Sequence, residues 1–268
     1  MNTSEFLNIT TLIAPERTAI VFDGKRITYA RLSDRVNRLS NVLAKMGVSG
    51  GDRIAMMQVN CNEHIEAYFA AAKLDAVYVP LNFRSSSEEI RYMLSDASPK
   101  AIFAGKRYTE TIDGITEDIE GLDIRIVIDG YAEKWLEYES IIETVNSDER
   151  FPHDDEDALT MLMFTAGTTG VPKGVMLSHD SFSSYILSNV SPADLDIEEK
   201  NILTVPLYHI AGVQAVMAAI YGGRTLIVQR QFEPEEWMDL VQTERANRAM
   251  MVPTMLKMLI DHPKFESH

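Results

Sequence analysis

The segment Phe164–Gly174, which reads FTAGTTGVPKG, combines residue types that suit phosphate binding. It begins within the apolar run MLMFT at 161–165 and precedes a second apolar stretch. Glycines allow backbone N–H groups to turn towards an anion, threonine hydroxyls supply further donors, and Lys173 adds a positive charge. A plain Gly/Thr/Pro hairpin with a solvated Lys173 is the alternative interpretation. Eleven ordered positions behind an apolar strand favour the phosphate-binding loop.

Two common nucleotide-binding motifs do not fit this segment. A Walker A loop counted from Gly167 would require glycine at position 172, where Pro172 stands. The G-x-G-x-x-G pattern of dinucleotide-binding folds does not occur in the sequence. A phosphotransferase or hydrolase of the Walker type is therefore disfavoured.

The pattern resembles the phosphate loop of the adenylate-forming superfamily, which includes acyl- and aryl-CoA synthetases, peptide-synthetase adenylation domains and luciferases. The family form is [YF]-T-S-G-[ST]-T-G-x-P-K-G, and this chain departs from it at Ala166, where serine is usual. That change removes a hydroxyl and keeps the backbone donors. The resemblance implies catalytic roles for Thr165 and Lys173. It also implies that the β- and γ-phosphates of ATP are held by Thr165, Ala166, Gly167, Thr168, Thr169, Gly170 and Lys173.

Four further segments are similar to ordered blocks of the same family. They are ITYARLSDRVNRLSNVLAKMGVSGGDRIAMM at 27–57, AVYVPLNFRSSSEEIRYMLSDA at 76–97, VPLYHIAGV at 205–213 and VPTMLKMLIDHP at 252–263. The last block is similar to the helix that precedes the family's adenine-binding block. The resemblance therefore extends along the whole chain and identifies it as similar to the N-terminal portion of an acid–CoA ligase.

The block VPLYHIAGV is similar to the family's P-x-x-H-x-x-G block, which implies that His209 lies beside the acyl and nucleotide pockets. Tyr208, Ala211 and Gly212 would be its neighbours in the acyl-substrate pocket. A hydrogen-bonded structural histidine with simply packed neighbours is the alternative. We expect His209 to position the acid rather than to act as a general base, because a carboxylate with a pKa near 4 is already ionised at neutral pH.

The resemblance implies a two-step reaction. A carboxylate oxygen attacks the α-phosphorus of MgATP, pyrophosphate leaves, and the thiol of CoA captures the acyl-AMP. ATP, Mg²⁺, CoA and a small carboxylic acid are thus the expected ligands, and no metal site made by protein side chains is expected. A peptide-synthetase adenylation domain and a non-catalytic ATP-binding or interaction module stay open as alternatives. Fatty, aromatic and alicyclic acids all stay open as substrates.

Up to His268 the sequence has no match to the family's adenine-binding block, its T-G-D block, its hinge or its C-terminal lysine. We therefore expect the 268-residue chain to correspond to about half of such an enzyme and to be inactive alone. A halved α/β domain should also expose strand edges and apolar surface, which favours a homodimer.

Charge and cysteine usage narrow the possible partners and location. The net charge is −15, and the window 110–157 holds 17 acidic and three basic residues. Such a field repels a nucleic-acid backbone, so nucleic acid is not expected as a partner. Cys61 stands alone, which excludes an intrachain disulfide and agrees with a cytoplasmic protein. No apolar run reaches the length of about 20 residues that a membrane-spanning helix needs.

The elements that must position the loop follow from the hydrophobic pattern. Helices are predicted at 28–47, 63–74, 86–96, 180–190, 213–221, 234–244 and 253–260, with Asp180 as the cap of the fourth. Strands are predicted within 49–59 and at 76–81, 100–104, 123–128, 159–165, 201–205 and 224–228.

This alternation predicts an α/β fold of mostly parallel sheets flanked by helices. Two subdomains of the N-terminal domain of an acyl-adenylate-forming enzyme are expected, at 1–150 and 151–268. The polar segment Asn146–Asp157, which carries a proline and lacks any period, marks the boundary between them.

Overall fold

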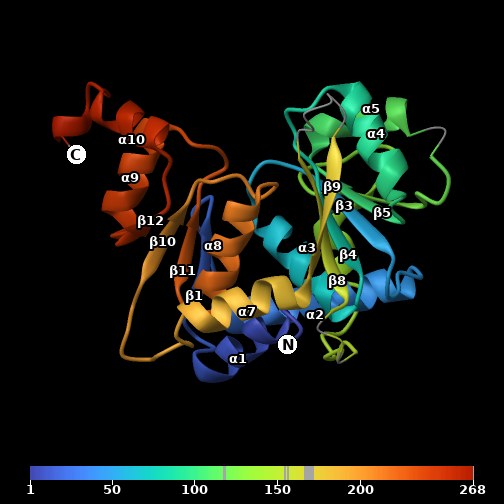
Figure 1. Ribbon diagram of the computed structural model, residues 1–268, viewed down its shortest axis with the longest axis horizontal. Helices are drawn as coiled ribbons and strands as arrows, with labels where there is room; N and C mark the ends of the chain where they lie inside the picture. The colour runs from blue at the N-terminus through green and yellow to red at the C-terminus, as the bar shows by residue number, and fades with distance from the viewer. Residues whose placement is uncertain (117–118, 154, 156, 166–171, 268) are drawn as a thin grey trace. The chain divides into compact units, whose positions relative to one another are not determined.

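The computed structural model describes residues 1–116, 119–153, 155, 157–165 and 172–267 (Figure 1). The chain forms two compact units. Unit 1 contains Met1–Ser4, Asp34–Gln58 and Glu63–Ser184, and unit 2 contains Glu5–Ser33, Val59–Asn62 and Tyr185–His268.

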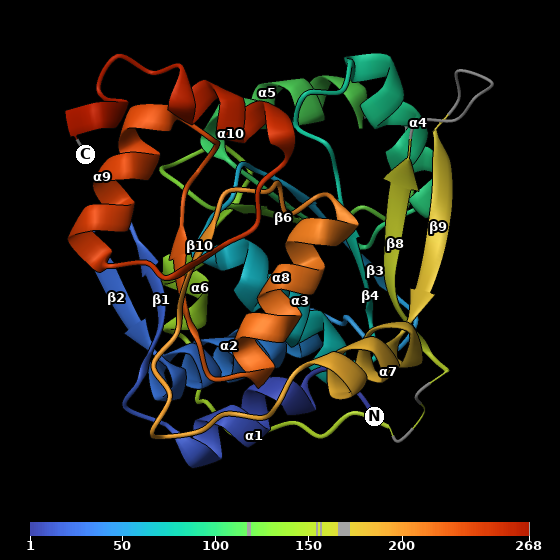
Figure 2. The same ribbon diagram turned by 60° about the vertical axis from the view of Figure 1, so that its left-hand side comes forward.

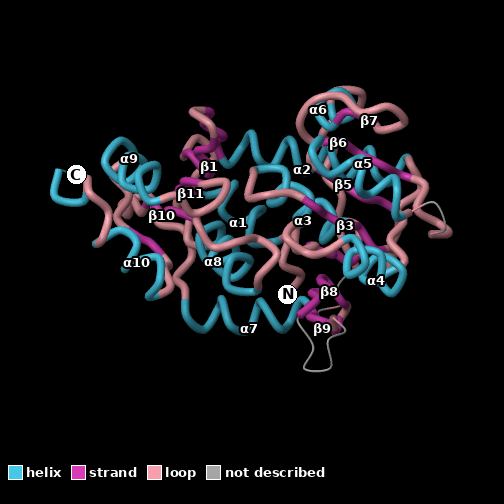
Figure 3. Tube along the Cα trace, turned by 90° about the horizontal axis from the view of Figure 1, so that it is seen from above, coloured by secondary structure: helices cyan, strands magenta, loops and turns pink. Residues whose placement is uncertain are grey.

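Unit 1 is built on a seven-stranded sheet in the order β7-β6-β5-β3-β4-β8-β9. Its strands are β3 (Arg53–Met57), β4 (Val77–Pro80), β5 (Ala101–Ala104), β6 (Ile124–Val127), β7 (Leu136–Glu137), β8 (Leu159–Thr165) and β9 (Lys173–Ser178). All neighbouring pairs are parallel except β8 and β9, which form an antiparallel ladder. Figure 3 shows β8 and β9 side by side.

The helices of unit 1 alternate with these strands. They are α3 (Asn62–Lys73), α4 (Ser87–Ala97), α5 (Lys106–Ile115) and α6 (Tyr138–Ile142), with parts of α2 (Tyr29–Lys45) and α7 (His179–Asn189). The strands β4 and β5 are buried along their full length, as expected for parallel strands covered on both faces. One core cluster joins β3, β4 and β5 to α4 and α5, through residues such as Ala55, Val79, Leu94, Ile102 and Ile112.

Unit 2 is built on a five-stranded sheet in the order β12-β10-β11-β1-β2. Its strands are β1 (Thr18–Phe22), β2 (Lys25–Thr28), β10 (Lys200–Leu203), β11 (Thr225–Val228) and β12 (Arg248–Ala249), parallel except for the β1–β2 hairpin. Its helices are α1 (Glu5–Ile13), α8 (Ile210–Tyr221), α9 (Pro234–Glu244) and α10 (Pro253–Ile260), followed by a 3₁₀ turn at Phe265–Ser267. Figure 2 shows α8 beside the strands and α9 next to β10.

Trp237, Leu240 and Val241 of α9 pack against a small core of Val21, Ile202 and Ile227 in this sheet. Among the described residues, no helix has the length and apolar character needed to cross a membrane.

The predicted fold class is confirmed, since both sheets are mostly parallel and flanked by helices. The cap predicted at Asp180 is wrong: α7 begins at His179, and the Ser178 hydroxyl accepts the Ser181 N–H at 3.3 Å. A serine just before the helix therefore fills the role given to Asp180.

The segment predicted as a subdomain boundary is tied to α2 in unit 1. The Asn41 side chain donates to the carbonyls of Asn146 (3.1 Å) and Asp148 (2.9 Å), and it accepts from Arg150 Nε at 2.7 Å. Unit 1 continues through this segment, so the compact units do not follow the division 1–150 and 151–268. That division stays a prediction about separate folding, which limited proteolysis would test.

Candidate active site

Thr165 and Lys173 bound the predicted phosphate loop and are cross-strand partners in the β8–β9 ladder. Both residues are exposed. The Thr165 hydroxyl donates to the Lys173 carbonyl at 3.5 Å, which is a weak hydrogen bond. The hydroxyl and the ammonium group therefore lie open to a ligand at the carboxyl end of β8, where ligands bind in open α/β sheets.

The other predicted phosphate ligands, Ala166, Gly167, Thr168, Thr169 and Gly170, lie outside the described residues. Their contacts with phosphate stay a prediction. The structure brings the two ends of the loop together through the ladder pair of Thr165 with Lys173.

Gly174, the last residue of the motif, has a packing reason to be glycine. It pairs with Phe164 across the ladder, and a Cβ at this position would lie 2.8 Å from Leu162 Cδ1. Leu162 and Phe164 in turn pack against the core of unit 1. The missing side chain thus lets β9 run close to β8 directly behind Lys173.

His209 is exposed and stands immediately before α8. Its carbonyl accepts the N–H groups of Gly212 (3.0 Å) and Val213 (3.2 Å), which starts the helix. The ring of the buried Tyr208 lies 4.8 Å from the His209 ring, tilted by 39°. Because β10 leads into α8, the imidazole lies beyond the carboxyl end of a parallel strand. Ligands of open α/β sheets commonly bind on this side.

The other two residues of the predicted acyl pocket lie in the first turn of α8. Ala211 is half-buried and Gly212 is buried. A Cβ on Gly212 would lie 2.4 Å from the Pro206 carbonyl oxygen and 3.1 Å from that of Val205. Backbone packing alone therefore requires glycine here. The contacts of Tyr208, His209, Ala211 and Gly212 with an acyl group stay a prediction.

Asn60 is a buried residue that sequence reasoning missed. Its side chain donates to the carbonyls of Val205 (3.1 Å) and Gln229 (3.2 Å) and accepts the Leu207 N–H at 2.9 Å. The only local signal is an asparagine directly after an apolar strand, in QVNCNEH. Sequence reasoning weighed its neighbour Cys61, which is buried and forms no disulfide.

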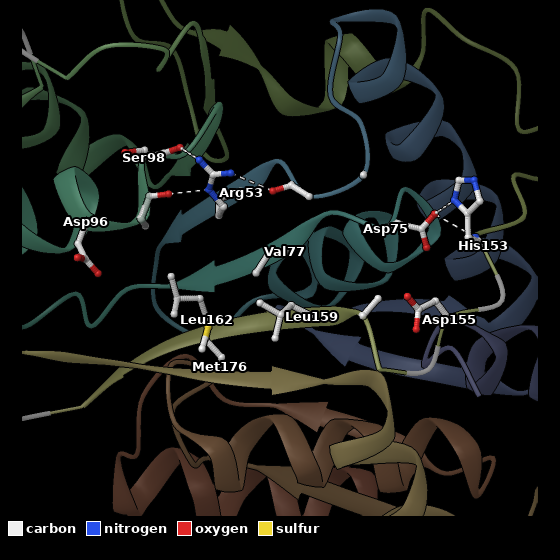
Figure 4. A pocket seen from close by; sticks show the side chains of 14 residues that line it. Arg53, Asp75, Val77, Asp96, Ser98, His153, Asp155, Leu159, Leu162 and Met176 are labelled. Carbon is white, nitrogen blue, oxygen red and sulfur yellow. Dashed lines mark hydrogen bonds and ion pairs between the residues drawn. The ribbon is translucent and has the colours of Figure 1, made fainter.

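A hollow of about 660 Å³ in unit 1 is lined by polar groups, and two of its charged or ionisable side chains, Arg53 and His153, bond to other lining residues (Figure 4). Arg53 donates to the carbonyls of Ala97 (2.7 Å) and Ser98 (2.9 Å), and the His153 ring donates to Asp75 at 2.7 Å. Arg53, Val77 and Leu159 begin β3, β4 and β8, so this hollow lies at the amino ends of the strands. It is therefore distinct from the loop, which leaves the carboxyl end of β8.

Two buried histidines of unit 1 serve structure. His64 donates from Nε2 to the Gln58 carbonyl (3.0 Å) and accepts the Tyr78 hydroxyl at Nδ1 (2.7 Å). His179 accepts the Thr3 N–H at Nδ1 (3.1 Å). Burial lowers the pKa of each histidine from 6.5 to about 4. Within the described residues, no group of three or more His, Cys, Asp or Glu side chains is arranged to hold a metal ion.

Comparison with known proteins identifies the family. Residues 12–268 match the family model of AMP-binding enzymes. The chain belongs to this family. The resemblance to acyl-CoA synthetases, predicted from the phosphate loop and its companion blocks, is thereby confirmed.

Acid–CoA ligases are among its relatives. The chain is 28% identical, over its whole length, to an indoleacetate–CoA ligase of Aromatoleum aromaticum, and it covers 52% of that protein. It is 32% identical over 90% of its length to the long-chain-fatty-acid–CoA ligase FadD13 of Mycobacterium tuberculosis, of which it covers 47%. The chain thus spans about half the length of the curated relatives it matches.

The fold has a close counterpart among solved structures. The N-terminal domain of FACL13 from Mycobacterium tuberculosis superposes with a TM-score of 0.88 and 30% sequence identity. The match covers 99% of this chain and 66% of that one. Both units therefore have the fold of the N-terminal domain of acyl-CoA ligases.

Proposed function

We propose that the protein to which this chain corresponds is an ATP-dependent acid–CoA ligase, which converts a carboxylate to acyl-AMP and then to acyl-CoA. The carrying observation is the accessible pair of Thr165 and Lys173, which bounds FTAGTTGVPKG at the carboxyl end of β8 in an AMP-binding enzyme. The chain spans about half the length of its curated relatives, so the complete reaction is proposed for the whole protein.

The donor set at this position suits the phosphates of ATP. Lys173 supplies a cation, Thr165 supplies a hydroxyl, and the glycines of the motif supply backbone donors. In the first step, negative charge gathers on the leaving pyrophosphate. These groups would hold it and neutralise that charge, so the contribution of the loop is positioning and electrostatics. Mg²⁺ bound with ATP would neutralise further phosphate charge.

His209 is proposed to orient the carboxylate of the acid substrate. Its exposed imidazole stands at the N-terminus of α8, where the helix dipole also favours a negative group. A hydrogen bond from the imidazole would orient the substrate carboxylate, which is ionised at neutral pH and needs no base. Tyr208 and Ala211 would form part of the wall for the acyl group.

An apolar acid is the best substrate class. The two relatives are named for indoleacetate and for long-chain fatty acids, and both of these carry an apolar body beside one carboxylate. CoA is the proposed acceptor because both relatives are named as CoA ligases. A single cysteine, Cys61, which forms no disulfide, agrees with a cytoplasmic location.

The decisive experiment measures ATP binding by calorimetry. Lys173→Ala should weaken binding by about 10- to 100-fold, because one charge-assisted contact is worth about 1.5–3 kcal/mol. Lys173→Arg should retain part of the affinity. Lys45→Ala removes another exposed lysine of unit 1 at the end of α2, and it should leave binding unchanged.

One result would contradict the role of the loop, and another would contradict the expected inactivity of the 268-residue chain. Equal affinities of wild type and Lys173→Ala would remove the role of the loop. Acid-dependent ATP–pyrophosphate exchange by the 268-residue chain would contradict its expected inactivity. ATP binding without turnover in the complete protein would instead favour a non-catalytic ATP-binding module.

A further inference from the structure

We propose that Asn60 is a positioning residue, which fixes the segment that presents Tyr208 and His209 to the substrate. This proposal rests on the proposed function for its link to catalysis. Its structural part concerns unit 2 alone, where Asn60, the 205–209 segment and β11 all lie.

Asn60 makes four hydrogen bonds to two separate backbone segments. Its amide nitrogen donates to the carbonyls of Val205 and Gln229, and its amide oxygen accepts the Leu207 N–H. Its own N–H donates to the Arg230 carbonyl at 3.1 Å. The residue is 2% exposed, so loss of the side chain would take the bonding partner from three buried backbone groups.

These bonds begin where the β10–β11 ladder stops. The last ladder pair is Leu203 with Val228, and one more bond follows from the Gln229 N–H to the Leu203 carbonyl at 3.0 Å. Beyond this point the two strands diverge into the loops that precede α8 and α9. Asn60 therefore joins two chain segments that the sheet no longer holds together.

The held segment leads directly to His209. The His209 N–H donates to the Pro206 carbonyl at 3.0 Å, between the two positions that Asn60 binds. The same stretch packs closely against Gly212, because a Cβ added at Gly212 would lie 2.4 Å from the Pro206 carbonyl oxygen. The backbone of residues 205–207 thus sets the direction of His209. Asn60 holds this backbone by hydrogen bonds, and Gly212 packs closely against it.

The chemistry at this position selects asparagine. Two carbonyl oxygens require two N–H donors, and one N–H requires an acceptor, which a carboxamide provides together. Aspartate keeps the acceptor but has no donor when ionised, and it places a negative charge against two carbonyl oxygens. Serine is neutral and smaller, and it offers one hydroxyl in place of three groups.

The test uses the 268-residue chain and compares Asn60→Asp and Asn60→Ser with wild type. Amide hydrogen exchange is followed at Leu207, His209, Gly212 and Val213, and the imidazole signals of His209 are followed by NMR. We expect exchange at these amides to become at least tenfold faster in both variants. We also expect the His209 ring signals to shift and broaden.

Thr225→Val is the matched control. Thr225 donates from its buried hydroxyl to the Thr18 carbonyl at 2.7 Å, at the opposite end of β11. The substitution Thr225→Val therefore removes one buried hydrogen bond from unit 2 and leaves the contacts of the 205–209 segment unchanged. Exchange at the four loop amides should change no more than exchange in β11, and the His209 signals should stay in place.

If both Asn60 variants accelerate exchange equally in the loop and in β11, with unmoved His209 signals, Asn60 stabilises the unit generally and the proposal is overturned. Should Asn60→Asp fail to fold, Asn60→Ser decides. Exchange is measured without ATP or acid, so a failure of the proposed ligase function would leave this result intact.

Discussion

The two segments that carry the predicted site residues are held by different means. The phosphate loop leaves β8 and enters β9, and the ladder pair of Thr165 with Lys173 joins its ends. The segment before α8 has no ladder, and a buried asparagine from a distant loop fixes its backbone instead. Residues that bind a ligand through charge can stay exposed on a hairpin, whereas a residue that must point in one direction needs a fixed backbone beneath it.

The largest expected effect is a loss of stability at low pH that is greater in unit 1 than in unit 2. His64 and His179 are both in unit 1, and burial lowers the pKa of each to about 4. The unfolded chain binds these protons near pH 6.5, so stability is complete above that pH and falls between 6.5 and 4. The loss is up to about 3 kcal/mol for each histidine.

Two tryptophans allow this loss to be assigned. Trp135 belongs to the core of unit 1 and Trp237 to that of unit 2. In single-tryptophan variants, the urea midpoint reported by Trp135 should fall more between pH 7.5 and 5 than the midpoint reported by Trp237. His179→Gln should reduce the pH dependence seen by Trp135. Equal shifts at both reporters would contradict the difference between the units.

The next effect compares the two tightly packed glycines. Gly212→Ala places a Cβ against a backbone carbonyl oxygen, which cannot move aside, and it should cost about 3 kcal/mol. Gly174→Ala meets the end of the Leu162 side chain, which can rotate, and it should cost about 1 kcal/mol. Urea unfolding measures both. A cost for Gly174→Ala equal to or above that of Gly212→Ala would show that the hairpin is held as rigidly as the segment before α8.

The smallest effect concerns the open edge beside the phosphate loop. β9 ends the sheet of unit 1, and Met176 on it is 67% exposed. We predict that the chain self-associates through this edge and that Met176→Lys weakens association at least tenfold, with little change in stability. Leu12→Lys alters an apolar residue of α1 that is 85% exposed, and it should leave association unchanged. Sedimentation measures the outcome, and a monodisperse wild-type monomer at high concentration would exclude the dimer.

Much of the fold could be predicted because its signals are local. The helix predicted at 86–96 is present as α4 and starts with a capping box, in which the Ser86 N–H lies 2.8 Å from Glu89 Oε2 and the Glu89 N–H 3.3 Å from the Ser86 hydroxyl. The strand β8 and the helix α9 occupy the predicted ranges. Buried strands and capped helices can be recognised from their own hydrophobic spacing and end residues, without knowledge of their tertiary partners.

What was missed depends on polar surroundings or on distant partners. The helix α5 is mostly polar, with the sequence KRYTETIDGI, and it buries only Thr109, Ile112 and Ile115. The elements α1, β1, β2, α6, β7 and β12 were also not predicted. Asn60 acts on a carbonyl 145 positions away, so no local pattern could have indicated its role.

During synthesis, the β8–β9 hairpin and the segment before α8 can form their contacts at different times. The β8–β9 hairpin joins neighbours in sequence, and such hairpins form on the order of 1–10 μs once both strands have left the ribosome. The bonds of Asn60 reach forward to Val205, Gln229 and Arg230, so they cannot all exist until those residues emerge. At roughly 5–20 residues per second, that takes several seconds longer. During this interval, the nascent chain has a complete hairpin at its phosphate loop and an unfixed backbone where His209 will stand.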